Sequence, residues 1–464
     1  MLKSRRTVRK CCILTSACGL AYNLRVLGTA AILPIGIGSL FALACLIAGF
    51  WAMQRKRLID DLPTSKTQGV FVGLTELKGT AESESPLTSY LAAVRCVQYS
   101  WQIDEHWSRT VVETYTDSKG HAQTRTRTET GWTKVADGRD SQPFYLKDDT
   151  GVIRIVPDGA RINAVNTYNE TLSRDNPLYF DKGPAREVAN TTHKRRFQET
   201  ALPLHAALYI VGQARERQDV VAAEVAYQKN TPMFLISTKA ERQISSGYGR
   251  WGWFWIIIGL VLAAAGAFVS GVSPATGLGL STAAVAVSCA VYILAFILGW
   301  IWAAYNSLVT LHHRVEQGWS QVDVELKRRS DLIPNLVAAV AGYSEHEKTT
   351  QEAVTQLRQQ IEATPPGVAG PDFKGMAPLL RVVTEQYPDL KANEAFLGLQ
   401  HSLEDTEQRI ALARDYYNDI ATFYNSRLQI VPDRYVGSLA RLRPQTLMSA
   451  SDFERAPVRV KLAS

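Results

Sequence analysis

Two long apolar runs that lie close together in the sequence constrain this chain more than any other feature. They cover residues 251–272 and 282–304, and neither contains an Asp, Glu, Lys or Arg. About 20 apolar residues in a helix, at a rise of ~1.5 Å each, cross a hydrocarbon layer of ~30 Å. We therefore expect two transmembrane helices. The alternative, a pair of buried core helices, is disfavoured because core helices rarely stay uncharged over this length.

The two runs are predicted to form a hairpin. The linker at 273–281 is uncharged and contains Gly and Pro, which favour a turn. Tryptophans lie at the start of the first run and at the end of the second, and in a hairpin these ends meet at one membrane surface, as in an interfacial aromatic belt. The tryptophans are Trp251, Trp253, Trp255, Trp300 and Trp302. The segments before and after the hairpin are therefore expected on the same side of the membrane.

A third apolar run, at 27–53, follows a basic segment at 1–26 and is closed by a basic cluster at 55–57. We interpret this run as a first transmembrane helix that is retained, because it is longer than the apolar core of a signal peptide. We expect a multi-pass protein of the cell membrane whose soluble regions lie on the cytoplasmic side. Basic residues beside the soluble regions favour the cytoplasm for those regions, whereas the basic N-terminus argues for the opposite orientation.

Charge and cysteine content exclude some functional classes. The net charge is +7, but the basic residues form no stripe with interleaved aromatics, so nucleic acid is not an expected partner. Basic residues near the membrane account for the surplus, and the lipid bilayer is the expected partner. Of the six cysteines only Cys96 lies in a soluble region, which excludes an internal disulfide or a Cys-rich zinc site there. No cofactor and no metal site are predicted.

Residues 58–250 are predicted to form a β-rich α+β domain, because short runs rich in β-branched and aromatic residues alternate with turn signals. The expected strands are 70–77, 94–103, 110–115, 124–134, 144–146, 152–156, 207–211, 220–226 and 233–237. A hairpin turn is expected at 117–120. In 124–130 threonines alternate with charged residues. We interpret this run as an exposed edge strand protected by charge, with an anion or lipid-headgroup patch as the alternative.

Several short motifs in this region resemble the GIDE domain of MULAN-type mitochondrial ubiquitin ligases and their prokaryotic relatives. The motifs are Gly79, Pro-Leu-Thr-Ser at 86–89, Arg-Cys-Val at 95–97 and Phe-Tyr-Leu-Lys-Asp-Asp-Thr-Gly at 144–151. In that family the ligase activity belongs to a RING domain with clustered Cys and His ligands. No cysteine follows Cys289, so the resemblance implies the domain without the ligase activity. Cys96 is interpreted as a buried strand residue; a nucleophilic role is the alternative, without an identifiable base.

The C-terminal region, 305–432, is predicted to be an antiparallel helical bundle. Apolar residues at three- and four-residue spacing form one seam that continues from the apolar run at 282–304, and a longer coiled-coil-type seam in 390–428. The residues expected to be buried are Leu308, Leu311, Val315, Trp319, Val322, Leu326, Phe396, Leu399, Leu403, Thr406, Ile410, Ala413, Tyr417, Ile420 and Tyr424.

The first seam is expected to be interrupted. Asp331 is predicted to cap a new helix, with Pro334 in its first turn, where a missing N–H is harmless. Further helices are expected at 345–362 and 376–387. Charged residues on the long helix are expected to pair the helices; they are Glu404, Asp405, Glu407, Arg409, Arg414 and Asp415.

The same region resembles the LemA family in the order and spacing of its residues. The matching segments are 305–309, 319–337, 342–343, 346–348, 387–393, 407–414 and 416–419. The resemblance implies a membrane-anchored α-helical bundle. No catalytic residue is established for the family, so none can be transferred.

Two local patterns invite a functional interpretation. His346-Glu347 resembles the start of a zinc-protease motif, but Thr350 stands where the second histidine is required, so no metal site follows. A charged cluster on the first seam helix is either solvated, ion-paired surface or a docking patch for an acidic partner or for lipid headgroups. This candidate interaction patch consists of Lys327, Arg328, Arg329 and Asp331.

Together the patterns predict a multi-domain membrane protein with three transmembrane helices, a β-rich α+β GIDE-like domain and an all-α antiparallel LemA-like helical bundle. The expected boundaries are a basic segment 1–26, helix 27–53, GIDE-like domain 58–250, helices 251–272 and 282–304, helical bundle 305–432 and tail 433–464.

The function predicted from these patterns is a non-catalytic membrane scaffold or adaptor. It would present both domains on one side of the membrane and organise or recruit an unidentified membrane or cytosolic protein; a homo-oligomer is left open. The alternative is an enzyme or a subunit of a membrane protein-modification or proteolysis system built on 58–250. A third hypothesis is lipid or anion sensing by the basic residues next to the membrane.

Overall fold

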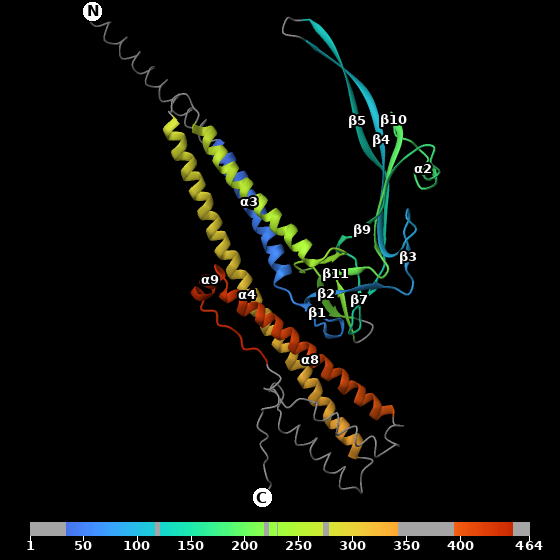
Figure 1. Ribbon diagram of the computed structural model, residues 1–464, viewed down its shortest axis with the longest axis vertical. Coiled ribbons are helices and arrows are strands. Elements are labelled where there is room, and N and C mark those ends of the chain that lie inside the picture. Colours follow the sequence, from blue (N-terminus) through green and yellow to red (C-terminus); the bar gives the residue numbers. More distant parts are fainter. Residues whose placement is uncertain are drawn as a thin grey trace, which may run out of the picture. The chain divides into compact units, whose positions relative to one another are not determined.

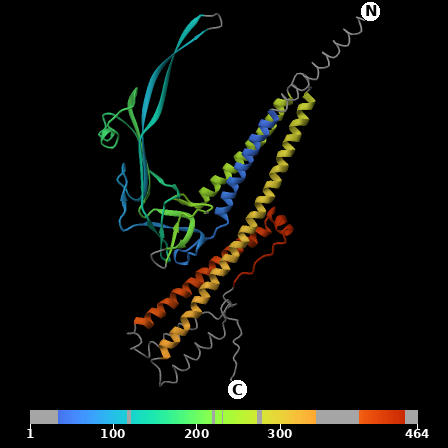
Figure 2. The same ribbon diagram turned by 180° about the vertical axis from the view of Figure 1, so that it is seen from behind.

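The structure is a computed structural model that describes residues 34–116, 121–217, 222–229, 231–271, 278–341 and 394–448. The predictions for 1–26, for the turn at 117–120 and for the segment 342–393 lie outside these residues. The chain divides into two compact units, which we describe separately (Figures 1 and 2). The first unit comprises 1–61, 242–315 and 421–446; the second comprises 62–241, 316–420 and 447–464.

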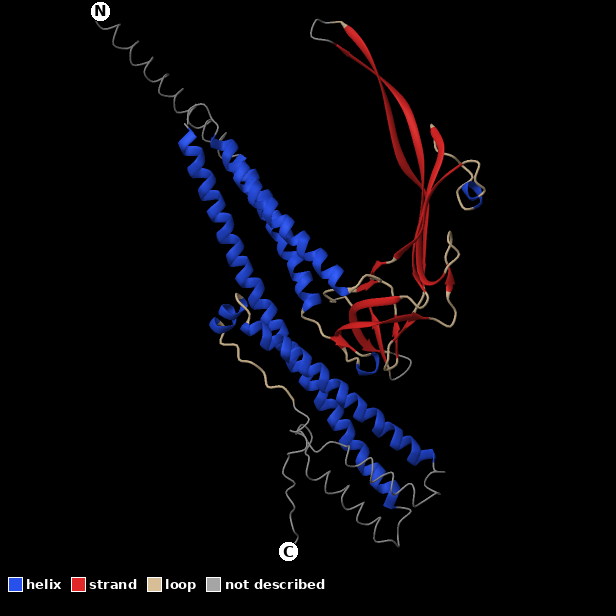
Figure 3. Cartoon of the chain, viewed as in Figure 1, coloured by secondary structure: helices blue, strands red, loops and turns tan. Residues whose placement is uncertain are grey.

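Three helices among the described residues are long and apolar enough to cross a membrane (Figure 3). They are Pro34–Asp60, most of α3 (Glu241–Gly271) and a large part of α4 (Leu278–Ala341). Each overlaps one of the apolar runs identified in the sequence. The helix α3 begins ten residues before its apolar run (251 minus 241), and Glu241 lies in its first turn, where the helix dipole favours an acidic side chain.

The first helix packs antiparallel against α3 through glycines. A Cβ added at Gly38 would lie 2.9 Å from the Cα of Gly266. One added at Gly49 would lie 2.7 Å from the Ile256 side chain and 3.2 Å from the Gly252 carbonyl oxygen. Small residues of this kind let two membrane helices approach closely.

The helices α3 and α4 also run antiparallel, in agreement with the predicted hairpin. The Tyr292 hydroxyl donates a hydrogen bond of 2.8 Å to the carbonyl of Ile256, and the rings of Trp253 and Phe296 have centroids 6.3 Å apart. The tryptophans at the start of α3 therefore lie beside the part of α4 that leads to its own tryptophans.

Polar residues of three helices meet at one place in the first unit. The Ser245 hydroxyl donates to Asp60 at 2.5 Å, and the Ser307 hydroxyl donates to Asp61 at 3.2 Å. Arg427 of α8 (Glu394–Gln429) also pairs with Asp61, at 3.2 Å. Buried charge needs such partners to offset its loss of hydration. These contacts lie where the chain passes from the apolar helices into the β-rich and C-terminal regions.

The β-rich region begins with a closed ring of strands in the second unit. The ring closes because β2 pairs antiparallel with both β6 and β11, while β7 and β12 complete it. The strands are β2 (Gly73–Glu82), β6 (Phe144–Lys147), β7 (Val152–Ile155), β12 (Ala223–Ala226) and β11 (Ala207–Glu216), flanked by β1 (Thr64–Ser65), β13 (Leu235–Ser237) and β8 (Arg161–Asn163). Leu77, Phe144, Leu146, Ile155 and Ile210 are fully buried in its core, which removes apolar surface from water.

A second sheet contains the longest strands, in the order β3-β4-β10-β9, with β5 paired to β4. The strands are β3 (Leu87–Thr88), β4 (Arg95–Thr116), β5 (Ala122–Ser141), β9 (Val165–Ser173) and β10 (Thr191–Pro203). A loop that carries the short helix α2 (Leu178–Asp181) connects β9 to β10. The sequence patterns predicted β4 and β5 but neither β9 nor β10.

The strands β4 and β5 form a long antiparallel hairpin whose far end is exposed on both faces (Figure 1). Among the described strands β5 pairs only with β4, so the edge-strand interpretation of 124–130 is confirmed. Arg109 and Glu129 face each other across the hairpin at 2.7 Å. Charged side chains of this kind discourage pairing of an exposed edge with another chain.

The C-terminal helices α4 and α8 pack antiparallel, as predicted. The Trp319 and Tyr417 rings have centroids 5.6 Å apart, and Arg329 lies 3.4 Å from Glu407. The predicted seam residues Leu308, Leu311, Val315, Val322, Leu326, Leu403, Thr406, Ile410, Ala413, Tyr417, Ile420 and Tyr424 are buried. The prediction that Trp319 is buried is wrong, because it is 46% exposed although its ring contacts Tyr417 of α8.

The predicted interruption of α4 is wrong. The helix continues without a break to Ala341 and includes Pro334, so Asp331 caps no new helix. A proline costs a helix one hydrogen bond and a clash with the preceding turn. Here the helix is already long on the N-terminal side of Pro334, and propagation past one defect is easier than starting a new helix. After α8 the short helix α9 (Asp433–Leu439) follows.

Candidate functional site

The four residues of the candidate interaction patch do not share one surface. Lys327, Arg328 and Asp331 are exposed on α4, whereas the side chain of Arg329 is only 8% exposed. Arg329 follows Leu326 by three positions and therefore lies on the same helix face as the buried seam. The surface that can meet a partner is reduced to the other three residues.

Arg329 instead forms an ion pair between α4 and α8. Its Nη1 lies 3.4 Å from Oε1 of Glu407 on α8. Of the charges expected to pair the helices, Glu407 does so, whereas Arg409 and Asp405 bind each other within α8 at 2.9 Å. A largely buried pair of this kind is costly to break, because either charge alone would lack a partner.

The β-rich region contacts α8 inside the second unit through the short 3₁₀ helix η1 (Thr67–Gly69). A Cβ added at Gly69 would lie 2.8 Å from the Cβ of Leu412. The amide of Gln68 donates a hydrogen bond of 2.9 Å to Asp405. The close approach needs a residue without a side chain at position 69, so this contact is specified by the sequence.

Asp148 in the turn between β6 and β7 holds η1 in place. Its carboxylate accepts bonds from the backbone N–H and hydroxyl of Thr67, at 2.8 and 2.7 Å. It also accepts bonds from the N–H of Thr150 and of Gly151, at 2.7 and 3.0 Å. Burial opposes ionisation of Asp148, but the bonds from Thr67 and Thr150 outweigh it and lower its pKa to about 2.

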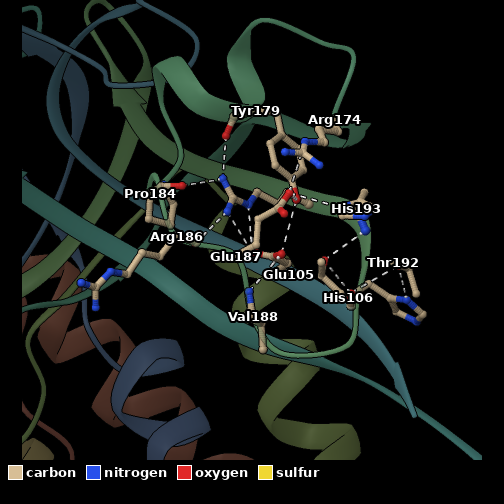
Figure 4. Close-up of polar contacts among 12 residues, drawn as sticks. Glu105, His106, Arg174, Tyr179, Pro184, Arg186, Glu187, Val188, Thr192 and His193 are labelled. Carbon is tan, nitrogen blue, oxygen red and sulfur yellow. Dashed lines mark hydrogen bonds and ion pairs between the residues drawn. The ribbon is translucent and has the colours of Figure 1, made fainter. Parts of the chain in front are cut away.

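A fully buried ion pair organises the loop that covers one face of the second sheet (Figure 4). Arg195 of β10 donates from Nε and Nη2 to the same carboxylate oxygen of Glu105 on β4, at 3.0 and 2.9 Å. Its remaining N–H groups reach the carbonyls of Tyr179, Pro184 and Arg186 at 2.7, 2.9 and 3.0 Å. All five guanidinium donors are therefore used, and the loop around α2 closes over the pair.

Tyr179 and Glu187 lie at the rim of this cluster, with His193 and Arg174 beside them (Figure 4). The Tyr179 hydroxyl donates to Glu187 at 3.1 Å, and the same carboxylate lies 3.1 Å from Nδ1 of His193. Burial raises the pKa of Tyr179 to about 12. The hydroxyl therefore stays protonated near neutral pH and acts as a hydrogen-bond donor. Through these contacts the cluster is a structural lock that holds the loop around α2 to the sheet.

Cys96 and the two histidines of the β4–β5 hairpin, His106 and His121, do not come together as a nucleophile and a base would. Cys96 is fully buried, and burial together with Glu199 raises the pKa of its thiol to about 11. His106 places Nδ1 2.8 Å from the hydroxyl of Thr192, while His121 lies exposed at the tip of the β4–β5 hairpin. In the described part of the chain, no group of His, Cys, Asp and Glu has an arrangement that could hold a metal ion.

Comparisons with known proteins confirm both resemblances. Residues 318–462 match the model of the LemA family, and residues 112–271 match the GIDE model, described as E3 ubiquitin ligase. Protein LemA of Metamycoplasma hominis is 27% identical over 158 residues, which cover 33% of this chain and 72% of the relative. The LemA match includes much of the segment expected to be a tail.

A more distant similarity concerns magnetosome proteins. MamQ of Magnetospirillum gryphiswaldense is 24% identical over 165 residues, covering 29% of this chain and 61% of the relative. MamQ 1 of Paramagnetospirillum magneticum is also 24% identical over 165 residues, and the chain spans 60% of its length. No solved structure gives a significant match to the chain.

Proposed function

We propose that this chain is a non-catalytic, multi-pass membrane scaffold that holds a GIDE-like domain and a LemA-like helical pair together and recruits a protein partner to the membrane. The observation that carries the proposal is the direct contact between the two modules through η1 and α8. Gly69 lies against Leu412, Gln68 bonds Asp405, and the Phe71 and Tyr416 rings have centroids 6.0 Å apart.

The arrangement of the membrane-length helices supports the same proposal. Asp60, Ser245 and Ser307 belong to three different helices and gather at one end of the first unit. Asp60 and Ser245 border the β-rich region, and Ser307 follows the apolar run of α4, so both modules would lie on one side of the membrane. The similarity to LemA and to magnetosome proteins is consistent with a role at a membrane.

The contact between the modules is tested first. Cysteines at Gln68 and Asp405 in the full chain, in native membranes, are treated with a short bis-maleimide, and the linked peptide is identified by mass spectrometry. We expect an efficient cross-link for this pair. The matched control joins Gln68→Cys with Asp415→Cys, an exposed position on the same helix. Equal yields for the two pairs would refute the contact.

Partner recruitment is tested on the exposed patch. Lys327→Glu with Arg328→Glu reverses two exposed charges on α4, and Lys327→Arg with Arg328→Lys preserves them. Proteins cross-linked to the full chain in cells are compared quantitatively. We expect a partner that is retained by the second variant and lost from the first, because an acidic surface would meet repulsion. An identical set of proteins for both variants would contradict recruitment through this patch.

The description of the GIDE model as E3 ubiquitin ligase favours one alternative, a subunit of a protein-modification system. No cysteine follows Cys289 in this sequence, so residues 290–464 contain no RING and the alternative rests on residues 58–250. Single substitutions of Cys96, His106 and His121 distinguish the two functions. Loss of a modification activity in any of them, with the fold intact, would favour the enzyme; the scaffold predicts no effect beyond stability.

A further inference from the structure

The second sheet has one covered face and one open face. Arg195, Phe197 and Glu199 of β10 point to the covered face and are buried. The residues between them, Arg196 and Gln198, point to the opposite face and are partly exposed, as the two-residue period of a strand requires. Around Gln102 and Gln198 this open face therefore remains accessible to a ligand.

Polar side chains cross the open face in two rows that are aligned by the register of four strands. The first row is Asn166, Thr200, Ser100 and Arg139; the second is Asn169, Gln198, Gln102 and Asp137. A groove of about 630 Å³ lies over these rows and is lined by Ser100, Trp101, Gln102, Asp137, Gly138, Arg139, Asn166, Gln198 and Thr200. This volume falls in the range of roughly 300–1,000 Å³ typical of small-ligand sites.

The groove is rich in groups that can both donate and accept hydrogen bonds. Amides and hydroxyls offer both functions from one side chain, and saccharide hydroxyls need this pairing. In the described part of the chain the side chains of Asn166 and Arg139 make no hydrogen bond or ion pair, so they are available to a ligand. Asp137 and Arg139 balance each other in charge, which disfavours nucleic acid and strongly anionic ligands.

An aromatic surface continues the open face beyond the groove. Trp132 is 40% exposed and stands opposite His106 in the β4–β5 pairing. The guanidinium of Arg196 lies 4.9 Å from its ring centroid, and the same Arg196 is held by Asp104 at 2.7 Å. From Ser100 to His106 the strand extends about 20 Å, enough for several sugar rings. The fixed indole offers a flat apolar face, as the C–H faces of a pyranose require.

A peptide is a poorer fit to this surface. Peptides that lie on sheets usually pair with an exposed strand edge and place alternate side chains in apolar pockets. The groove lies over the face of β9, β10, β4 and β5 and is lined mainly by polar side chains. We propose that the open face of this sheet binds an uncharged oligosaccharide, with the amide rows contacting its hydroxyls and Trp132 stacking on a ring.

The proposal is tested by saturation-transfer NMR with the full chain in lipid nanodiscs. The probes are cellotetraose and tetra-N-acetylchitotetraose, and a neutral tetrapeptide of Asn and Gln serves as the competing ligand class. We expect saturation of the sugar ring protons for at least one saccharide. Gln102→Ala with Gln198→Ala should weaken its binding at least about fivefold, since each lost hydrogen bond contributes about 1 kcal/mol.

Two further variants keep the test independent of folding. Asn166→Ala removes an exposed side chain that has no partner among the described residues, so it should leave thermal unfolding unchanged and still weaken saccharide binding. Gln123→Ala, on the exposed hairpin tip, is the matched control and should bind as the unmodified chain does. No transfer to either saccharide, binding that both groove variants leave unchanged, or transfer to the peptide alone would each overturn the proposal.

Discussion

Replacement of Arg195 by Met tests the reasoning about the buried cluster most directly. The substitution keeps a side chain of similar length but removes all five donors, so Glu105, fully buried, loses its only cationic partner in the described part of the chain. Removing one partner of a buried ion pair costs about 3–5 kcal/mol. The carbonyls of Tyr179, Pro184 and Arg186 lose their donors as well, so we expect a value at the upper end of this range.

The assay must report on this part of the molecule, because a chain with several modules does not unfold in a single two-state transition. Hydrogen exchange of the amides in β10 and in the loop at 174–190 gives a local free energy of opening. Glu105→Leu combined with Arg195→Met removes both charges and should recover much of the loss, since an apolar pair often replaces a buried ion pair without cost.

Arg109→Met is the matched control. Arg109 pairs with Glu129 on the exposed hairpin, with side chains 56% and 30% exposed, so its loss should cost less than about 1 kcal/mol. If Arg195→Met changed the opening free energy of the loop by no more than this control, the pair would not be the lock that its geometry indicates.

Three further outcomes follow from the described contacts. Hydrogen bonds lower the pKa of Asp148 from 3.8 to about 2, so its ionised form stabilises the β6–β7 turn above pH ~4, and this stabilisation disappears as pH falls through about 2. Solvent screening limits the stabilisation to roughly 1–2 kcal/mol. Asp148→Asn should therefore show lower hydrogen-exchange protection of η1 at pH 7 and no further change in acid. Ile410→Ala should cost about 2–5 kcal/mol in the α4–α8 pair, measured by exchange in 316–329, because Ile410 is 1% exposed. Cys96, as the sole cysteine of a variant, should resist maleimide at pH 8 and react fully in denaturant, since burial raises its pKa to about 11.

The helical part could be predicted well because its signal is local. Leu403, Ile410 and Tyr417 repeat at helical spacing, and each is buried against α4. Spacing within one helix needs no knowledge of distant partners. Trp319 shows the limit, because membership of a seam does not decide how far a large ring remains exposed.

The β-rich part was predicted less completely, for a physical reason. In β10 the inward positions include Arg195 and Glu199, so the alternation of apolar and polar residues that identifies a strand is hidden. Arg195 can be buried only because Glu105, ninety residues away, accepts its hydrogen bonds, and Glu199 accepts bonds from the backbone N–H groups of Leu91 and Ala92. For the same reason the sequence predicted Arg329 in an exposed patch, whereas its charge is buried between α4 and α8 and paired with Glu407. Buried charge is therefore where single-sequence reasoning about this chain fails.

The short motifs that carry the GIDE resemblance act together in the structure, and their contacts indicate what they do. A Cβ at Gly79 would lie 2.4 Å from the carbonyl oxygen of Lys147, so the pairing of β2 with β6 requires glycine there. Lys147 begins the turn in which Asp148 holds η1, and η1 in turn meets α8. The motif thus builds the β ring and orients the segment that contacts the helical pair. Residues with this role fix the arrangement of the two modules on which the proposed scaffold depends, and they lie apart from the residues that line the groove on the open face of the second sheet.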